Sequence, residues 1–328
     1  MPITSSGGFT FRNYTSDADY THMHTVKESL VKAGLIDAAG SPELLKNNYE
    51  HTNNFDPRTN LLLAFKGDEP CAYTTCWWDR DGKTAKISFT FALYTRPDQT
   101  DQVGQTMLSW ALERIKAIYL SLGEPTEAFI NASADDCNPA QIKLLEKNGF
   151  KPARYYYFMT RDLINEPIPD LPLPTGLALK PAAIDDYRKI WDASTTAFID
   201  EWDSIEYTET NYQGWINNAH FQPYLWQIAW DGDKPVGMIT NYVDLEENQE
   251  KQRRRGYTED IWVLKDYRRR GIAGALLARS LAMFKLMNLT EASLSVDTEN
   301  PSGANRLYTN LGFKPYRTEI EFRKTLIL

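Results

Sequence analysis

The stretch that decides the fold is YTEDIWVLKDYRRRGIAGALLARSLAMFKLM, residues 257–287. Its early part, DIWVL, is apolar and rich in residues that favour β-strands. After DYRRRG, the apolar residues Leu277, Leu281 and Phe284 recur at i, i+4 and i+7, which is helical spacing. The pattern therefore predicts a strand that passes through a short turn into a helix.

The turn has the composition of an anion-binding turn. The first amides of a helix lack intrahelical partners and lie at the positive end of its dipole. Gly271 and Ala273 keep bulky side chains away from these amides, and Arg268, Arg269 and Arg270 add positive charge. A pyrophosphate fits such a turn. The alternative is a small-residue turn that simply begins a surface helix, and the six residues alone leave both open.

The chain also contains an internal repeat. Gly-Phe-Lys-Pro occurs at 149–152 and again at 312–315, so the two glycines are 312 − 149 = 163 residues apart. Gly-Asp-x-Pro and Asn-Pro recur in the same order at nearly the same offset. A long period with only two copies predicts duplicated domains rather than a solenoid.

Each copy has the same predicted order of elements. A helix is followed by a β-hairpin with a Gly-Asp-x-Pro turn, a strand, a long helix, a strand, a short helix and an aromatic-rich strand. This mixture predicts an α/β or α+β sheet domain. The proline-rich segment NEPIPDLPLPTG places a linker at 164–175, between domains 1–163 and 176–328.

The strand, the Arg-x-x-Gly-x-Ala turn and the helix together resemble the acyl-CoA pyrophosphate motif of the GNAT superfamily of N-acetyltransferases. The downstream segment SLSVDTENPSGANRLYTNLGFKP is similar to that family's next strand, short helix and closing turn. Asn300 and Pro301 suit the cap and first position of the short helix, and Gly312 suits its end. The layout resembles tandem GNAT proteins of the mycothiol synthase type. The resemblance implies two GNAT domains, each a mixed, mostly antiparallel sheet flanked by helices.

The resemblance also implies acetyl-CoA as the co-substrate. The strand before the turn would offer backbone groups to the pantetheine arm, and the turn with the helix start would hold the pyrophosphate. The family also places a polar contact to the cofactor near the short helix. The residues at these positions are Ile261, Trp262, Val263, Arg268, Arg269, Arg270, Gly271, Ile272, Ala273, Gly274 and Asn300.

Tyr308 matches the family tyrosine that protonates the departing CoA thiolate, and a phenol can donate such a proton. The alternative for Tyr308 is a buried aromatic residue in the last turn of an amphipathic helix. Glu259 is the candidate base, because it is a carboxylate in an apolar strand whose alternation places it on one face with Ile261 and Val263. It could instead close a turn or pair with the arginines at 253–255. Some family members carry a carboxylate on the next strand, where this chain has Ser295.

The first copy departs from the motif at the decisive positions. Gln102 stands opposite Gly271, with an aspartate just before it, so a side chain and a negative charge occupy the place of the pyrophosphate. Leu145 stands opposite Tyr308. We therefore expect a non-catalytic N-terminal domain that shapes the amine pocket or stabilises the protein.

Composition limits the remaining partners. A net charge of −8 argues against non-specific nucleic-acid binding, and from the sequence we expect neither a transmembrane span nor a signal peptide. Three cysteines fit a reducing cytoplasm, and His22-x-His24 lacks further metal ligands at suitable spacing, so no metal is expected. A monomer or homodimer is consistent with the sequence.

The sequence thus predicts an N-acetyltransferase that acts on the primary amine of a small molecule. Two alternatives stay open: a non-catalytic acyl-CoA-binding regulatory protein, and a protein or peptide N-acetyltransferase.

Overall fold

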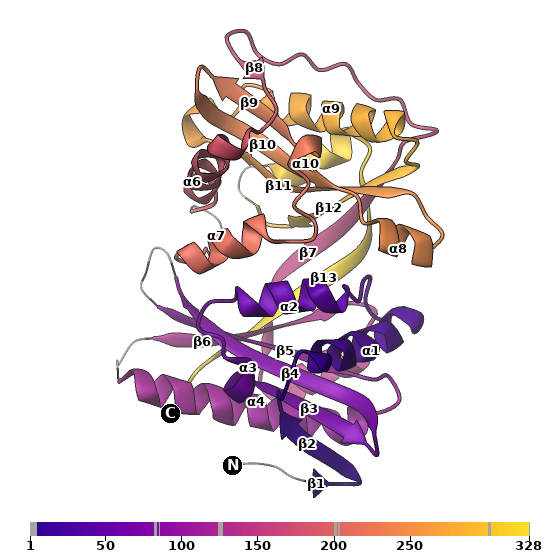
Figure 1. The fold of residues 1–328 in the computed structure, drawn as a ribbon, viewed down its shortest axis with the longest axis vertical. Helices are drawn as coiled ribbons and strands as arrows, with labels where there is room; N and C mark the ends of the chain where they lie inside the picture. Colours follow the sequence, from indigo (N-terminus) through magenta and orange to yellow (C-terminus); the bar gives the residue numbers. More distant parts are fainter. Residues whose placement is uncertain are drawn as a thin grey trace. The chain divides into compact units, whose positions relative to one another are not determined.

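The computed structural model describes residues 5–81, 84, 86–123, 127–199, 202, 204–300 and 303–327 (Figure 1). The chain divides into two compact units. The N-unit comprises Met1–Tyr155, Ile205–Ala219 and Glu319–Leu328. The C-unit comprises Tyr156–Ser204 and His220–Thr318.

The N-unit is built on a mixed sheet with the strand order β1-β2-β3-β4-β5-β6-β13. All neighbouring pairs in it are antiparallel except the parallel pair β5 and β6. The predicted Gly-Asp-x-Pro hairpin joins β3 and β4, and its Gly67 has φ 63°, a conformation that glycine adopts without strain. The strands are β1 (Ser5–Ser6), β2 (Phe9–Asn13), β3 (Leu61–Lys66), β4 (Glu69–Arg80), β5 (Ile87–Thr95), β6 (Ala128–Asp135) and β13 (Lys314–Thr325).

Helices cover both faces of the N-unit sheet (Figure 1). Because strand side chains alternate, Leu61 and Leu63 pack with α1 and α2, whereas Leu62 and Ala64 pack with α4 and α5. The helix α7, which comes from the second sequence copy, packs against α2. The helices are α1 (Ala18–Lys32), α2 (Pro42–Glu50), α3 (Pro57–Asn60), α4 (Thr100–Leu122), α5 (Pro139–Lys147) and α7 (Glu209–Ile216).

In the C-unit the strands are hydrogen-bonded in the order β7-β12-β11-β10-β9-β8. Its predicted hairpin joins β9 and β10, and α9 packs on β9, β10 and β11. The strands are β7 (Lys151–Asp162), β8 (Ala178–Leu179), β9 (Gln227–Asp231), β10 (Lys234–Tyr242), β11 (Arg255–Val263) and β12 (Glu291–Asp297). The helices are α6 (Tyr187–Phe198), α8 (Leu245–Glu250), α9 (Ile272–Leu286) and α10 (Ala304–Asn310), with short 3-10 turns at Ile184–Asp186, Pro223–Leu225 and Lys265–Tyr267. These mixed sheets with flanking helices confirm the predicted fold class.

The later part of the last strand of each sequence copy belongs to the other unit, from Tyr156 in β7 and from Glu319 in β13. Strand β7 ends the first copy, yet it pairs with β12 from Tyr156↔Asp297 to Asp162↔Glu291. Strand β13 ends the second copy, and its residues from Glu319 onward pair with β6. The boundaries of the compact units therefore differ from those of the contiguous domains 1–163 and 176–328. These contiguous domains stay a prediction from the sequence repeat.

The repeated Gly-Phe-Lys-Pro marks the same corner twice. Gly149 and Gly312 have φ 83° and 86°, a left-handed conformation suited to the end of a helix. The amide of Phe150 bonds the carbonyl of residue 145 at 3.1 Å, and that of Phe313 bonds the carbonyl of residue 308 at 3.0 Å. The two corners are thus structurally equivalent.

The predicted start of α10 is wrong. Asn300 accepts a backbone hydrogen bond from Gly303 in a tight turn, and the helix begins at Ala304 after Gly303, whose φ is 80°. Pro301 lies outside the described residues. In the first copy, Asn138 does cap α5, because its side chain accepts from the amide of Gln141 at 3.3 Å.

No helix of the described residues is long and apolar enough to cross a bilayer.

Candidate active site

The turn between β11 and α9 leaves an open backbone surface. Gly271 is the N-cap of α9 with φ 84°, and Arg269 just before it has φ 60°. A Cβ placed on Gly271 would meet no heavy atom of the described chain within 4 Å. Any larger residue here would be strained by its backbone and would fill this space.

The first amides of α9 lie next to Gly271 along the chain. Among the backbone hydrogen bonds of the described residues, none is donated by the amides of Ile272, Ala273 or Gly274. The side chain of Ile272 is buried, and the site of a Cβ on Gly237 of β10 lies 3.0 Å from it. The helix start is therefore fixed to the sheet by Ile272 while its amides stay available for an anion.

Arg268 has its side chain directed into the protein. Its Nε donates to the carbonyl of Val263 at 3.0 Å, and its Nη2 donates to the carbonyl of Ala197 at 3.0 Å. The guanidinium thus ties the turn both to the end of β11 and to the end of α6. Its amide donates to the carbonyl of Lys265 at 3.3 Å. The predicted contact of Arg268 with a pyrophosphate stays a prediction.

Arg269 and Arg270 are exposed on the turn. The guanidinium of Arg270 lies 5.4 Å from the centre of the Tyr267 ring, and Tyr267 donates a hydrogen bond to Asp231 at 2.8 Å. A cation over an aromatic face gains electrostatic attraction from the ring. Both arginines can add positive charge to the open surface.

Strands β11 and β12 separate beside this turn. Their parallel pairing covers only Arg255↔Glu291, Gly256↔Ala292 and Tyr257↔Ser293. Beyond Tyr257, β11 continues to Val263 without pairing with β12. The rest of β12 pairs only with β7. Ile261, Trp262 and Val263 therefore lie on the separated part of β11, where a neighbouring chain could use backbone groups.

A β-bulge in β11 changes the face of the sheet on which Glu259 lies. Thr240 pairs with Glu259 and Met238 pairs with Trp262, so Asp260 and Ile261 together oppose one residue of β10. Because paired residues share a face, Glu259 lies on the side of Trp262 rather than that of Val263. The predicted shared face of Glu259 and Val263 is wrong, since strict alternation fails at the extra residue.

Glu259 has a strongly raised pKa. Its surface is only half-buried, yet it lies deep among protein atoms. This burial, with a smaller contribution from the charge of Asp260, raises its pKa to about 8, and a hydrogen bond with Ser295 opposes the rise. Ser295, which replaces the family carboxylate of the next strand, therefore contacts the candidate base.

The arginines near Glu259 have other partners. Arg253 donates to Glu247 at 2.6 Å, and Arg255, which is buried at the start of β11, donates to Glu291 at 2.7 Å. The side chain of Glu291, not that of Glu259, is thus the carboxylate that Arg255 contacts here.

Tyr308 is buried in the last turn of α10, with its ring 6.2 Å from that of Phe313. The helix α10 contacts β12, the strand that carries Ser295. Tyr308 and Glu259 are thus both connected to β12, one through a helix and the other through a hydrogen bond. Leu145, the equivalent residue of the first copy, is a core residue of the N-unit.

Arg161 of β7 holds the end of α10. It is 2% exposed, and its Nε donates to the carbonyl of Leu311, the C-cap of α10, at 2.5 Å. Its Nη2 donates to the carbonyl of Pro167 at 2.7 Å, so it also fixes the proline-rich segment. A cation at a helix C-terminus is favourable for the helix dipole. Gly312 leaves room for this arrangement, since its Cβ would lie 2.2 Å from the Glu166 Oε2 and 3.3 Å from the Arg161 Nε.

The equivalent turn in the first copy is shorter, because the helix that follows it begins earlier. The helix α4 begins at Thr100 with Gln99 as N-cap, so only four residues separate it from the end of β5 at Thr95. In the second copy, eight residues separate the end of β11 at Val263 from the start of α9 at Ile272. Gln102 therefore lies within the first turn of α4, where the second copy has its open turn.

Within the part of the chain that the structure describes, no group of three or more His, Cys, Asp or Glu side chains is placed to hold a metal ion. Cys71 and Cys76 are buried in β4, and burial raises the pKa of Cys76 to about 12. His24 bonds the carbonyl of Gly40 at 2.7 Å, as a structural histidine does.

The model of the acetyltransferase (GNAT) family matches residues 187–313, which contain β11, the open turn, α9 and Tyr308. The sequence match places residues 187–313 in the GNAT acetyltransferase family. No curated protein sequence matches the chain.

Solved GNAT structures extend the likeness to the whole chain. A GCN5-related N-acetyltransferase from Sphaerobacter thermophilus is 21% identical, with a TM-score of 0.71 over 98% of this chain and 97% of its own. A tandem GNAT protein from the clavulanic acid biosynthesis pathway is 12% identical, with a TM-score of 0.67 over 97% and 98%. At these identities the likeness shows the fold, which is that of a tandem GNAT protein.

Sequence reasoning missed three features of this GNAT site. The bulge in β11, the inward guanidinium of Arg268 and the buried Arg161 all depend on partners elsewhere in the fold. A weak signal existed for Arg161, because it is a charged residue in an otherwise aromatic-rich strand.

Proposed function

We propose that this GNAT protein transfers an acetyl group from acetyl-CoA to a primary amine of a small molecule in the second half of the chain. The observation that carries the proposal is the open turn at Gly271. There, free helix amides lie next to a strand that has separated from its neighbour. A pyrophosphate and an extended pantetheine arm need these two features side by side.

The residues present fit acetyl-CoA, which supplies the acetyl group as a thioester. The amides of residues 269–274 would hold the pyrophosphate, and Arg269 and Arg270 would add charge. Ile261, Trp262 and Val263 would offer backbone groups to the pantetheine arm, although the carbonyl of Val263 already accepts from Arg268. Asn300, at the turn before α10, would supply a polar contact.

The proposed chemistry needs one base and one acid. Glu259 takes a proton from the attacking amine as the new C–N bond forms, and its raised pKa suits a base that works at slightly alkaline pH. Tyr308 gives its proton to the sulfur as the C–S bond breaks. No covalent intermediate with the protein is required, because the amine attacks the thioester directly.

A thiol-release assay tests the proposal. Acetyl-CoA is offered with small amines, aminoglycosides, amino acids and peptides in parallel. We expect turnover with small amines, and Tyr308→Phe should keep CoA binding while turnover falls about 100-fold or more. Turnover with none of these acceptors despite CoA binding would favour a regulatory binder, and turnover with peptides alone would favour a peptide acetyltransferase.

We also propose a cytoplasmic location and no metal requirement. The three cysteines Cys71, Cys76 and Cys137 are free thiols, which supports a reducing compartment. Monomer or homodimer stays a prediction that size-exclusion chromatography with light scattering can test.

A further inference from the structure

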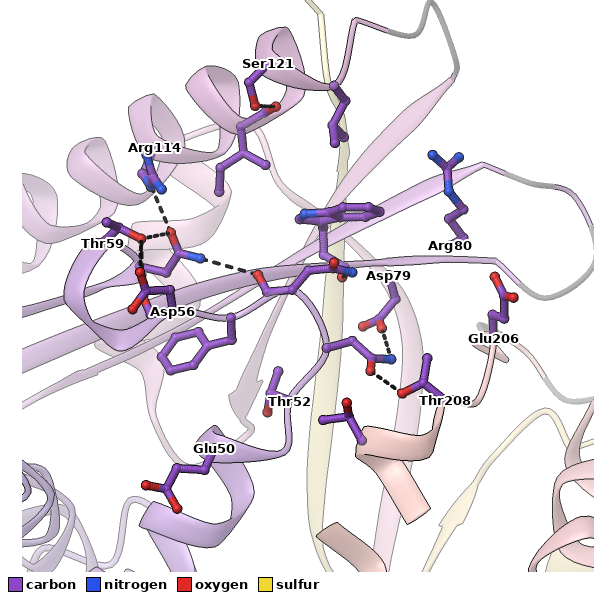
Figure 2. A pocket seen from close by; sticks show the side chains of 18 residues that line it. Glu50, Thr52, Asp56, Thr59, Asp79, Arg80, Arg114, Ser121, Glu206 and Thr208 are labelled. Carbon is purple, nitrogen blue, oxygen red and sulfur yellow. Dashed lines mark hydrogen bonds between the residues drawn. The ribbon is translucent and has the colours of Figure 1, made fainter. Parts of the chain in front are cut away.

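The N-unit contains a cavity of 820 Å³ far in sequence from the proposed acetyl-transfer site (Figure 2). It is bordered by the loop between α2 and α3, the end of β4, the second half of α4 and the start of the 205–219 segment. All of its lining residues belong to the N-unit. The volume is in the range of small-molecule sites.

A segment of the second copy builds one wall of this cavity. Ile205–Ala219 joins the N-unit, and within it the hydroxyl of Thr208 donates to Asn53 at 2.8 Å. The amide of Glu206 donates to the carbonyl of Arg80 at 3.1 Å. Figure 2 shows Asp79, Arg80 and Glu206 on one side of the cavity. The wall is therefore fixed by hydrogen bonds before any ligand binds.

The lining is rich in acceptors because its donors already bond within the protein. The Asn53 amide nitrogen donates to Asp79 at 2.8 Å, and that of Asn54 donates to the carbonyl of Trp78 at 2.9 Å. Side-chain donors used in this way belong to Thr52, Asn53, Asn54, Ser121 and Thr208. Each hydroxyl has one hydrogen but two lone pairs. A hydroxyl that already donates its hydrogen can therefore still accept a hydrogen bond. A complementary ligand must bring its own donors.

The charges of the lining favour a cation. The lining contains four carboxylates and two guanidinium groups, and the two arginines already have protein partners. Arg114 donates to Asn60 at 2.9 Å, and the Arg80 guanidinium lies 5.7 Å from the centre of the Trp78 ring. Figure 2 shows carboxylates on both sides of the cavity. They are Glu50 and Asp56 on one side and Asp79 and Glu206 on the other.

We propose that this cavity is a second binding site, specific for a small molecule that carries more than one protonated amine. An ammonium group is a pure donor with three hydrogens, which matches an acceptor-rich wall. Carboxylates on opposite sides of the cavity favour a ligand with two separated positive charges over a ligand with one. The proposal concerns binding in the N-unit and does not depend on acetyl transfer in the second half of the chain.

Calorimetric titration with spermidine tests the site. We expect saturable binding by the whole protein in roughly 0.15 M salt, where diffuse surface attraction is largely screened. The double variant Asp56→Asn, Glu206→Gln should weaken binding at least about tenfold, or ~1.4 kcal/mol. Asparagine keeps the N-cap that Asp56 provides for α3. The matched control Glu43→Gln, Asp233→Asn removes the same net charge at exposed positions outside the cavity.

Four outcomes would overturn the proposal. Three are the absence of saturable spermidine binding, equal loss in the cavity variant and the control, and equal affinity for mannitol, an uncharged polyol. If spermidine bound only at the acetyl-transfer site, its affinity for the cavity variant would equal its affinity for the unmodified protein. That result would also overturn the proposal. Acetyl-CoA binding and the thermal midpoint of each variant show whether it is folded. A failed acetyl-transfer assay would leave the spermidine result unaffected.

Discussion

At the scale of single residues, the charge of Asp260 opposes the ionisation of the adjacent Glu259. Burial and the charge of Asp260 raise the pKa of Glu259 to about 8, and burial raises the pKa of Asp260 as well. Asp260 has φ 43° at the bulge, a conformation that asparagine and aspartate tolerate better than other side chains. The bulge therefore begins at the acid that follows the candidate base in the sequence.

The first prediction concerns the pH dependence of acetyl transfer. Glu259 must lose its proton to act as a base, so kcat/KM should rise with pH through about 8. Asp260→Asn removes a negative charge that disfavours the ionised form, so the midpoint of this rise should move to lower pH. The profile of kcat/KM against pH measures it. A midpoint that stays in place or moves upward contradicts the assignment, and the exposed Asp233→Asn serves as control.

The second prediction concerns stability and has the opposite sign. Glu259 binds its proton more tightly in the folded protein than at its ordinary pKa of 4.5. The folded state therefore loses stability as pH rises from about 4.5 to about 8. Glu259→Gln should raise the thermal midpoint more at about pH 9 than at about pH 5, relative to the unmodified protein. An equal effect at both pH values would show that the carboxyl is well solvated.

Residue types in the site were predictable, but their contacts were not. Gly271 and Tyr308 belong to local motifs, so their positions follow from neighbouring residues. The partners of Arg161 and Arg268 lie 150 and 71 positions away along the chain. The direction of a long side chain depends on such distant partners, and local patterns contain no information about them.

At the scale of elements, the turn before α9 and its counterpart before α4 differ in length rather than in one residue. The third prediction follows. Gly271→Gln should weaken CoA binding about tenfold or more, because it fills the open face beside the helix amides. Gly176→Gln is the control, since Gly176 also has a left-handed backbone, with φ 90°, and open space around it.

Both glycine variants should lose about 1–2 kcal/mol of stability from backbone strain. CoA affinity, measured by calorimetry, should separate them. Unchanged affinity in Gly271→Gln would show that the cofactor site is elsewhere. Gln102→Gly should gain no CoA binding, because that position lies inside the first turn of α4.

The fourth prediction concerns the end of α10. Arg161→Leu leaves buried carbonyls without donors, at about 1–3 kcal/mol each, and releases the turn that carries Tyr308. We expect kcat to fall while KM for acetyl-CoA changes little, with partial rescue by Arg161→Lys. Arg279→Leu, on the exposed side of α9, is the control. A fall in thermal midpoint with unchanged kcat would assign Arg161 a purely structural role.

Period and turn residues predicted β11, α9 and both hairpins. They did not predict the bulge, because one extra residue barely changes a short apolar strand. They also placed the start of α10 too early, since an Asn-Pro pair can begin a turn as well as a helix.

At the scale of the whole molecule, each compact unit depends on a strand from the other sequence copy. The fifth prediction is that deleting residues 319–328 destabilises the N-unit. Strand β6 would lose its pairing from Phe129 to Asp135. Hydrogen exchange should show these amides losing protection, while amides of α9 change less. A deletion of residues 327–328 alone, which keeps the bond from the Leu326 amide to β6, is the control. Unchanged protection of β6 after the longer deletion would contradict the pairing.

The repeat predicted the duplication but not the exchange of strands. Both β7 and β13 follow the same Gly-Phe-Lys-Pro corner, and both are twelve-residue strands. Two strands with matching patterns can satisfy either sheet edge, so local sequence does not determine which sheet each one joins.

The strand exchange has a consequence for how the chain is made. A domain usually folds as soon as its own residues have left the ribosome, at about 5–20 residues per second. The N-unit has to wait for Ile205–Ala219 and then for residues from Glu319 onward, long after residue 155 has been synthesised. During that interval of roughly ten to thirty seconds, β6 has a free edge of the kind that pairs with other chains. Nascent chains of this protein should therefore depend on chaperones more than chains whose domains are contiguous.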